Sequence, residues 1–350
     1  MRENTTTPYG RYAILIVTAI LSLLPFIYML SVSFMTLGEA LNTQIYWPGA
    51  LRWENYVIAW DQARFSAYLL NSVIVTVGTV GGQLILCALA GYAFAQVSFR
   101  GRDVFFLLVL ATLMVPESVL ISPLYQIILG RVLPMWMLQA LAATMVAVSL
   151  VILAYFIVAM INTRLKHEWP LKSTGAGVAA ILILAVIATG GVRPFDENII
   201  IEELGRDNWL NTYMVMIIPF FGNAYAIFLF RQFFKQMPGE LIQAARLEGA
   251  GHLSFFLRVA VPLNLPSFAT IALLGFIWSW NSFMWPRLTQ LDDSGYLTLP
   301  VGLDNFNRDG GADLHLLMAG AVISVIPVLL LYLSALRLFV NAAARSGIKG

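Results

Sequence analysis

A short polar segment between long apolar runs has the clearest spacing in the chain. It reads Gln243-Ala244-Ala245-Arg246-Leu247-Glu248-Gly249 and is followed by Val259-Ala260-Val261-Pro262. Residues 240–248 are adequate helix formers, and Gly249 suits the left-handed position that ends such a helix. The two adjacent alanines would leave one side of this helix flat, and Arg246 and Glu248 could form ion pairs at its rim. The pattern predicts a surface that contacts another protein, with an ordinary solvated loop as the alternative.

A carboxylate inside an apolar run is a second candidate for chemistry. Glu117 follows Pro116 within such a run, and a charged side chain at membrane depth is costly and by default functional. The proline frees a backbone carbonyl and could bend the helix toward a cavity. Glu117 is therefore a candidate lining of a transport pathway, unless it lies solvated at the outer headgroup level.

A third candidate set combines aromatic rings with an amide. Trp278, Trp280 and Asn281 follow one another closely at the end of an apolar run. Aromatic faces stack on the C–H surfaces of sugars, and amides bond to sugar hydroxyls. The alternative for the tryptophans is anchoring at the membrane interface, where indole rings are enriched.

The elements that must position these residues are membrane helices. The chain has 350 residues, of which 59% are hydrophobic and 11% charged, whereas a soluble domain carries about 25% charge. Apolar runs long enough to cross a bilayer recur along the chain and are too uniform for the alternating strands of a barrel. This composition predicts an all-α polytopic membrane protein. The scattered basic residues and the net charge of +2 do not suggest nucleic acid, and the single cysteine, Cys87, excludes a disulfide within the chain and a metal site built from cysteines.

Hydropathy places eight spans, and the basic residues orient them. The first apolar run exceeds the length of a cleavable signal peptide, so we expect it to be retained. One alternating set of loops holds 14 Lys and Arg residues and the other holds 7, which predicts that the first set and both termini are cytoplasmic. The predicted spans are 12–33, 66–95, 104–124, 135–161, 174–192, 211–230, 263–284 and 314–339.

The polar segment resembles a cytoplasmic loop of the inner-membrane permease subunits of ABC importers. That loop has the pattern Glu-Ala-Ala, three residues, Gly, nine residues, Ile, one residue, Leu-Pro. This chain keeps the spacing, with Gln243 in place of the acid and Val259 and Val261 as aliphatic replacements. The resemblance implies that residues 231–262 form a cytoplasmic coupling loop whose short helix binds a cleft on a separate ATPase subunit. The residues implied in this contact are Gln243, Ala244, Ala245, Arg246, Glu248, Gly249, Ala250 and Pro262.

Further landmarks are similar to one branch of that family, the carbohydrate importers of the maltose type, and to their second permease subunit. The similarity covers most of the chain, and it adds Asn71 to the candidate substrate pathway. Its landmarks are Tyr68–Ser72, Ala90–Ala95, Pro123–Tyr125, Phe228–Phe234, Trp280–Phe283 and the C-terminal Gly347–Gly350.

One region departs from the family pattern. Where relatives have a short outer loop, residues 126–207 contain two additional apolar runs joined by a basic linker. We therefore expect residues 1–350 to form a single transmembrane domain, with the six-helix core of a type I ABC importer permease and an inserted transmembrane hairpin at 126–207. Two extra spans return the chain to the side it left, so the coupling loop stays cytoplasmic. The hairpin is expected either to face lipid or to contact an extra partner.

The resemblance implies a transport subunit for carbohydrate in the inner membrane of a prokaryote. The implied partners are a second permease in a heterodimer, two ATPase subunits, an extracytoplasmic solute-binding protein and membrane lipid. Since the sequence has no phosphate-binding loop, ATP and Mg are expected on the partner ATPase, and no cofactor or metal is expected on this chain, which is not itself an enzyme. Another small solute, such as a polyol or glycerol-phosphate, is an alternative cargo. An ion-driven secondary transporter would instead show charge pairs in the spans and an inverted repeat, and a membrane enzyme would show clustered acids or histidines at one membrane face.

Overall fold

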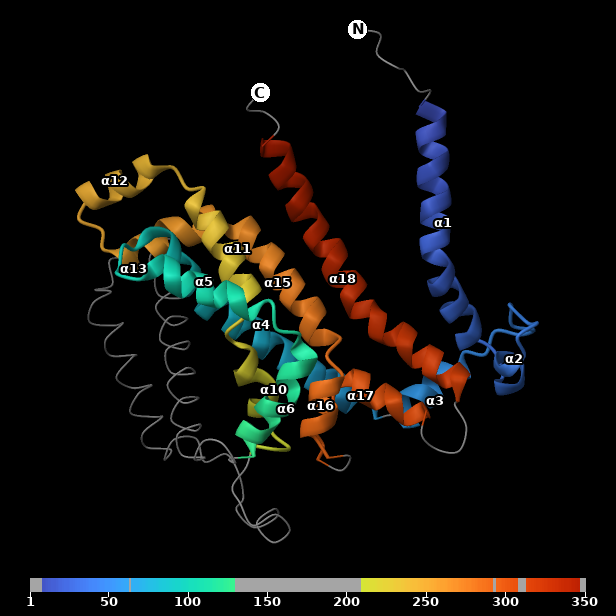
Figure 1. The fold of residues 1–350 in the computed structure, drawn as a ribbon. Helices are drawn as coiled ribbons and strands as arrows, with labels where there is room; N and C mark the ends of the chain where they lie inside the picture. The colour runs from blue at the N-terminus through green and yellow to red at the C-terminus, as the bar shows by residue number, and fades with distance from the viewer. Residues whose placement is uncertain (1–7, 63, 130–208, 292–293, 308–312, 347–350) are drawn as a thin grey trace, which may run out of the picture. The chain divides into compact units, whose positions relative to one another are not determined.

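The described part of the chain is helical throughout. A computed structural model describes residues 8–62, 64–129, 209–291, 294–307 and 313–346 (Figure 1). Within these ranges there are helices, turns and bends but no strand, so the predicted all-α class is confirmed for them. The predicted spans 135–161 and 174–192, and nearly all of the predicted hairpin 126–207, lie outside the described residues.

Among the described residues, three helices are long and apolar enough to cross a membrane without a break. They are α1 (Pro8–Ser33), α4 (Phe65–Gln96) and α18 (Leu314–Ser346). Their span-forming parts are Tyr12–Ser33, Phe65–Gln96 and Leu314–Ser334. These parts lie at three of the predicted spans, 12–33, 66–95 and 314–339.

Three further spans are bent pairs of shorter segments. Helices α5 (Arg102–Thr112) and α6 (Glu117–Ile128) meet at 100°. Helix α10 (Tyr213–Ile217) continues into a 3-10 turn, Ile218–Phe220, which meets α11 (Ala224–Lys235) at 43°. The segment His252–Leu263 meets α15 (Leu265–Trp280) at 79°. If each pair is one span, the described residues hold six spans, at six of the eight predicted positions.

The chain packs as two compact units. The first contains residues 1–71 and 297–332, and the second contains residues 72–296 and 333–350. Helices α4 and α18 each continue from one unit into the other. Every contact below lies within one unit.

The first unit is built around the end of α1 and three short helices. These are α2 (Leu37–Leu41), α3 (Glu54–Gln62) and α17 (Leu299–Asp304), which a 3-10 turn, Asn305–Asn307, follows. The buried Asn55 side chain donates to the carbonyls of Ser33 and Met35 at 2.9 and 2.8 Å. Those carbonyls lie at and just after the end of α1, where no helical partner exists. One amide therefore satisfies them and fixes α3 against the exit of α1.

The second unit has an aromatic core at one end. The buried rings of Phe230 and Phe234 on α11 stack at 5.9 Å, and Tyr92 on α4 meets Phe234 edge-on at 5.7 Å. The same cluster includes Phe255 and Phe256, which follow the predicted coupling helix in sequence. Core packing of this kind holds the candidate coupling segment against α4 and α11.

A buried polar face of α4 organises the rest of the second unit. The Ser279 hydroxyl of α15 donates to the Thr76 hydroxyl at 3.5 Å, and Gln83 Nε2 donates to the Phe220 carbonyl at 3.0 Å. A Cβ on Gly275 would lie 2.7 Å from Gln83 Oε1, so glycine lets α15 approach α4 closely. Thr76 and Gln83 thus fix both α15 and the 3-10 turn before α11.

Candidate functional site

The predicted coupling segment contains a short helix with a fully formed C-terminal cap. Helix α12 (Gly239–Leu247) begins after Pro238. At its end the Gly249 N–H donates to the Arg246 carbonyl at 3.0 Å, and the Ala250 N–H donates to the Ala245 carbonyl at 2.9 Å. Gly249 has φ +78°. These two bonds and the left-handed glycine form a Schellman motif, which confirms the conformation predicted for Gly249.

The two alanines of the motif do not form one flat face. Ala244 is exposed, whereas Ala245 is 9% exposed and packs into the aromatic core with Ala250 beside it. Neighbouring positions on a helix point about 100° apart. The expectation that both alanines face a partner therefore changes: Ala245 attaches α12 to its own unit, and Ala244 belongs to the exposed side.

The exposed side of α12 includes a large apolar residue that the motif does not mark. Leu247 is 90% exposed, and Gln243, Arg246 and Glu248 are exposed with it. A leucine of this exposure on a polar protrusion is a candidate contact for another protein. Its sequence signal was a lone leucine between Arg246 and Glu248, which the motif treats as a variable position.

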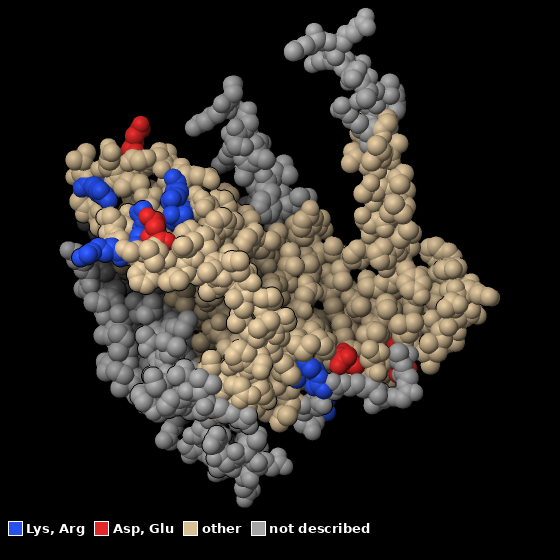
Figure 2. Space-filling view, viewed as in Figure 1, with Lys and Arg blue, Asp and Glu red and all other residues tan. Residues whose placement is uncertain are grey.

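Basic side chains surround this protrusion. Figure 2 shows Lys and Arg gathered at the end of the second unit that carries α12 and α13 (His252–Phe255), and the exposed basic residues of α11 to α14 are Lys235, Arg246 and Arg258. This placement agrees with the charge asymmetry that predicted a cytoplasmic loop.

The segment after α12 is anchored in the core. Helix α13 leads through one turn of π-helix, Phe256–Ala260, into α14 (Val261–Leu263). Phe255, Phe256 and Leu257 are buried, while Pro262 is exposed. Because proline lacks an N–H and its ring clashes with the carbonyl four residues before it, a widened turn just before Pro262 accommodates the ring. The helical segment after α12 is thus embedded in the unit through these side chains and does not lie free on its surface.

A buried arginine holds the helix that leads into α12. Arg231 is near the end of α11, and its side chain is 10% exposed. Its Nε donates to the Phe94 carbonyl at 3.3 Å, its Nη2 lies 3.7 Å from Asp103 Oδ1, and its guanidinium carbon lies 3.8 Å from the centroid of the Phe106 ring. The guanidinium therefore ties α11 to the end of α4 and to the first turns of α5.

Two of the predicted pathway residues meet in the second unit. The Trp278 indole Nε1 donates to Glu117 Oε2 at 3.2 Å, although the residues are 161 positions apart. Glu117 is the first residue of α6, where the bent span restarts after Pro116. The Phe220 ring meets the Trp278 ring edge-on at 4.9 Å. This brings a carboxylate and two aromatic rings together where bent spans meet.

The other three pathway residues have structural surroundings. Asn71 is buried in the first unit and donates to the Leu297 carbonyl at 2.9 Å. Trp280 is buried and stacks on Phe276 at 5.3 Å. Asn281 is the C-cap residue of α15, and its side chain donates to the Ile277 carbonyl at 2.8 Å. These contacts support the fold of each unit, and the pathway role of the three residues stays a prediction.

Comparison with known proteins decides the family. Residues 173–345 match the model of the binding-protein-dependent transport system inner membrane component. The chain belongs to this family of ABC importer permeases.

Several curated relatives of this permease are transport proteins. It is 26% identical over 336 residues to the arabinooligosaccharides transport system permease protein AraQ of Halalkalibacterium halodurans, covering 95% of this chain and 93% of the relative. It is 27% identical to the diacetylchitobiose uptake system permease protein NgcG of Streptomyces coelicolor, covering 92% and 82%. The sn-glycerol-3-phosphate transport system permease protein UgpE of Yersinia enterocolitica is 25% identical, with 85% and 82% covered.

A solved structure shares the fold of this permease. The match is a chain of a bacterial ABC transporter involved in the import of the acidic polysaccharide alginate, with a TM-score of 0.62 and 19% identity. The comparison covers 96% of this permease and 98% of that chain. At this identity the likeness shows the fold alone.

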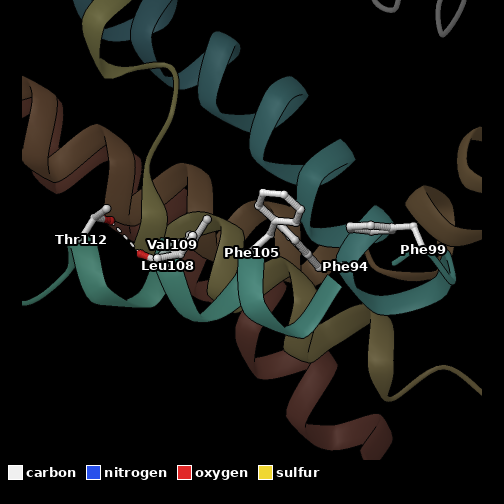
Figure 3. Close-up of a pocket in the computed structure, with 6 residues that line it drawn as sticks. All are labelled: Phe94, Phe99, Phe105, Leu108, Val109 and Thr112. Atoms are coloured by element: carbon white, nitrogen blue, oxygen red, sulfur yellow. Dashed lines mark hydrogen bonds between the residues drawn. The ribbon is translucent and has the colours of Figure 1, made fainter. Parts of the chain in front are cut away.

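The permease also has an apolar groove that does not suit a sugar. Its volume is about 370 Å³, and the only hydroxyl in its lining, that of Thr112, donates to the Val109 carbonyl at 2.7 Å. A sugar site needs several polar groups that converge on the ligand, which this groove lacks. Figure 3 shows its lining residues, Phe94, Phe99, Phe105, Leu108, Val109 and Thr112.

Proposed function

We propose that this permease carries a carbohydrate across the inner membrane of a prokaryote. Two of the relatives are named as permeases for sugar oligomers, arabinooligosaccharides and diacetylchitobiose. The landmarks that resemble the carbohydrate branch support the same cargo. Energy comes from ATP, which binds with Mg on two separate ATPase subunits, and an extracytoplasmic solute-binding protein delivers the sugar.

The exposed side of α12 is the docking surface for one ATPase subunit in this proposal. The observation that carries the proposal is Leu247, which is 90% exposed on a capped helix whose opposite side is buried through Ala245. Exposed Gln243, Arg246 and Glu248 supply a polar rim for Leu247, and Ala244 is exposed beside them. An apolar centre with a polar rim is the usual arrangement of a protein interface.

Motion of the ATPase subunit reaches the spans through packed side chains. When ATP closes the ATPase pair, α12 moves with it. Because Phe255 and Phe256 are buried among α4 and α11 residues, α13 and α14 transfer this motion to the spans. Arg231 keeps α11 and α5 together, so the spans turn as a group from inward-open to outward-open and receive the sugar.

The topology follows from the same orientation. With α12 in the cytoplasm, both termini are cytoplasmic, and the chain has eight spans if residues 126–207 form a lipid-facing transmembrane hairpin. The permease pairs with a second, similar permease in a heterodimer. The basic residues around α12 support this orientation.

Site-specific crosslinking in living cells tests the docking surface. In a Cys87→Ser background, Leu247→Cys should capture an ATPase subunit through a short thiol crosslinker. The matched control is Tyr46→Cys, because Tyr46 is 65% exposed and lies in a predicted outer loop, so it should capture no ATPase. Capture of the ATPase by neither cysteine, or equally by both, would contradict the proposed docking surface.

Uptake measurements test the cargo. The complete transporter with its solute-binding protein should take up an oligosaccharide such as arabinotriose or diacetylchitobiose. Glycerol 3-phosphate is the comparison solute, because one relative is named for its transport. Uptake of glycerol 3-phosphate without uptake of any oligosaccharide would make the carbohydrate assignment wrong while leaving the docking surface intact.

A further inference from the structure

Two bends of membrane helices meet the C-terminal end of a third helix, α15, in the second unit. Glu117 starts α6 after the 100° bend, Phe220 ends the 3-10 turn before the 43° bend, and Trp278 lies in the last turn of α15. They are joined by the 3.2 Å hydrogen bond from Trp278 to Glu117 and by the 4.9 Å edge-on contact of Phe220 with Trp278. Irregular backbone at membrane depth is tolerated where it is buried in protein or lines a water-filled cavity. Discontinuous helices form the substrate sites of many transporters.

The Glu117 carboxylate retains capacity for a ligand. It is exposed, and within the described residues the Trp278 indole donates to its Oε2. An ionised carboxylate accepts hydrogen bonds at both oxygens, so Oε1 can accept another. A charged group at membrane depth needs polar partners, and a hydroxyl-rich solute in a hydrated pathway supplies them.

The aromatic side of the cluster is held in place by buried polar contacts. Ser279, the neighbour of Trp278, bonds to Thr76, and the Phe220 carbonyl accepts from Gln83. Both Thr76 and Gln83 are buried on α4. The Trp278 ring on α15 and the Phe220 ring in the 3-10 turn are therefore both fixed to α4. A binding site needs such rigid support.

We propose that Glu117 and Trp278 form a subsite of the transport pathway for a neutral sugar ring. This rests on the proposed carbohydrate cargo and adds the charge class of the substrate. The carboxylate accepts hydrogen bonds from sugar hydroxyls, the indole N–H holds the carboxylate in place, and the Trp278 and Phe220 rings present C–H-binding surface. The negative charge repels an anionic solute, so this subsite disfavours phosphorylated or acidic sugars.

The test uses the complete transporter in proteoliposomes with saturating solute-binding protein. Glu117→Gln removes the charge at constant shape, and Trp278→Phe keeps a ring but removes the indole N–H. Each should lower the initial rate of arabinotriose or diacetylchitobiose uptake about tenfold, since hydrogen bonds to a charged group are lost. ATPase activity stimulated by the binding protein and the thermal midpoint of the complex should stay close to those of the unaltered transporter.

Matched controls separate the subsite from general damage. Asp61→Asn removes an exposed carboxylate from α3, and Trp47→Phe removes the N–H of an exposed tryptophan; both should leave uptake unchanged. If Glu117→Gln and Trp278→Phe transport sugar normally, the subsite is wrong and the proposed function stands. If they lower uptake only together with the thermal midpoint and the ATPase activity, the pair is structural and the subsite is also wrong. If the unaltered transporter takes up no oligosaccharide, both the carbohydrate assignment and the subsite fail.

Discussion

Two short helices between spans, α2 and α12, are fixed at opposite ends by different means. In α2 the N-terminus is held by side chains: the Glu39 N–H donates to the Thr36 hydroxyl oxygen at 3.2 Å, and the Thr36 N–H donates to Glu39 Oε2 at 2.8 Å. In α12 the C-terminus is held by backbone bonds around Gly249. The first cap depends on two side chains and a charge, whereas the second depends on one backbone angle.

The two caps are therefore sensitive to different changes. The capping box of α2 can be weakened by protonation or by removal of a hydroxyl. The Schellman motif of α12 contains no titratable group and can be broken by adding a Cβ at Gly249. If α12 transmits motion as proposed, a backbone cap suits it, because such a cap does not depend on the protonation of a side chain.

The largest expected effect comes from Gly249→Val. A β-branched residue at φ +78° strains the backbone by about 1–3 kcal/mol, and since no heavy atom lies within 4 Å of a Cβ there, the effect is conformational and not steric. We expect transport and ATPase co-isolation to be lost while the protein still inserts into the membrane. Gly251→Val is the matched control, because Gly251 has φ −73° and equally open surroundings. Normal uptake by Gly249→Val would refute the role given to α12.

A smaller effect is expected where α11 is held before α12. Arg231→Lys keeps the charge but loses the Nε bond to the Phe94 carbonyl and the planar contact with Phe106, which together contribute about 1–2 kcal/mol. The thermal midpoint of the purified protein should fall by several degrees. Arg102→Lys should change it little, because Arg102 pairs with the same Asp103 from a more exposed position. Equal shifts in the two variants would contradict the specific role of Arg231.

The capping box of α2 gives the next effect. Thr36→Val keeps the shape of the side chain but removes the N-cap oxygen, which costs about 1 kcal/mol. Chemical denaturation of the purified protein measures this loss. The comparison variant is Thr18→Val, since the Thr18 hydroxyl only donates to the Ile14 carbonyl within α1 and should be dispensable. A Thr36→Val protein as stable as the unaltered one would show that the box contributes nothing.

The smallest effect is a pH dependence confined to α2. Hydrogen bonds from the backbone N–H groups of Thr36 and Gly49 and from the Thr36 hydroxyl lower the pKa of the Glu39 carboxyl. A lowered folded pKa means that the stabilisation is fully present above the ordinary value of 4.5 and is lost as the pH falls through the folded value. Hydrogen exchange of residues 36–49, corrected for intrinsic rates, should therefore speed up on acidification below the ordinary value. Glu39→Gln should remove that dependence, and residues 240–250 should show none.

The sequence predicted the spans well because hydropathy is a local property. Runs 12–33 and 66–95 coincide with the span-forming part of α1, Tyr12–Ser33, and with α4 to within one residue at each end. Pro116 indicated the bend before Glu117, which is present at 100°. The 43° bend before α11 was not predicted, although Pro219 in the 3-10 turn and Gly222 just before α11 are local signals of a helix break.

Site residues were predictable by type but not by environment. Both Glu117 and Trp278 were predicted to line a pathway. Residue spacing could not predict their contact, because the two residues lie 161 positions apart. Trp280 resembles Trp278 in sequence, and the rotation of α15 against α4 decides that one is buried and the other is available. In the same way, the packing of α12 decides that Ala245 points inward and Ala244 outward.

The closed cap of α12 has a mechanical consequence for assembly. The N–H groups of Gly249 and Ala250 already bond to the Arg246 and Ala245 carbonyls, so the proposed docking of an ATPase subunit would order little additional backbone at the end of α12. Association with a preorganised surface loses less conformational entropy. In the proposed mechanism, a rigid α12 would also pass its displacement to the membrane spans with little loss.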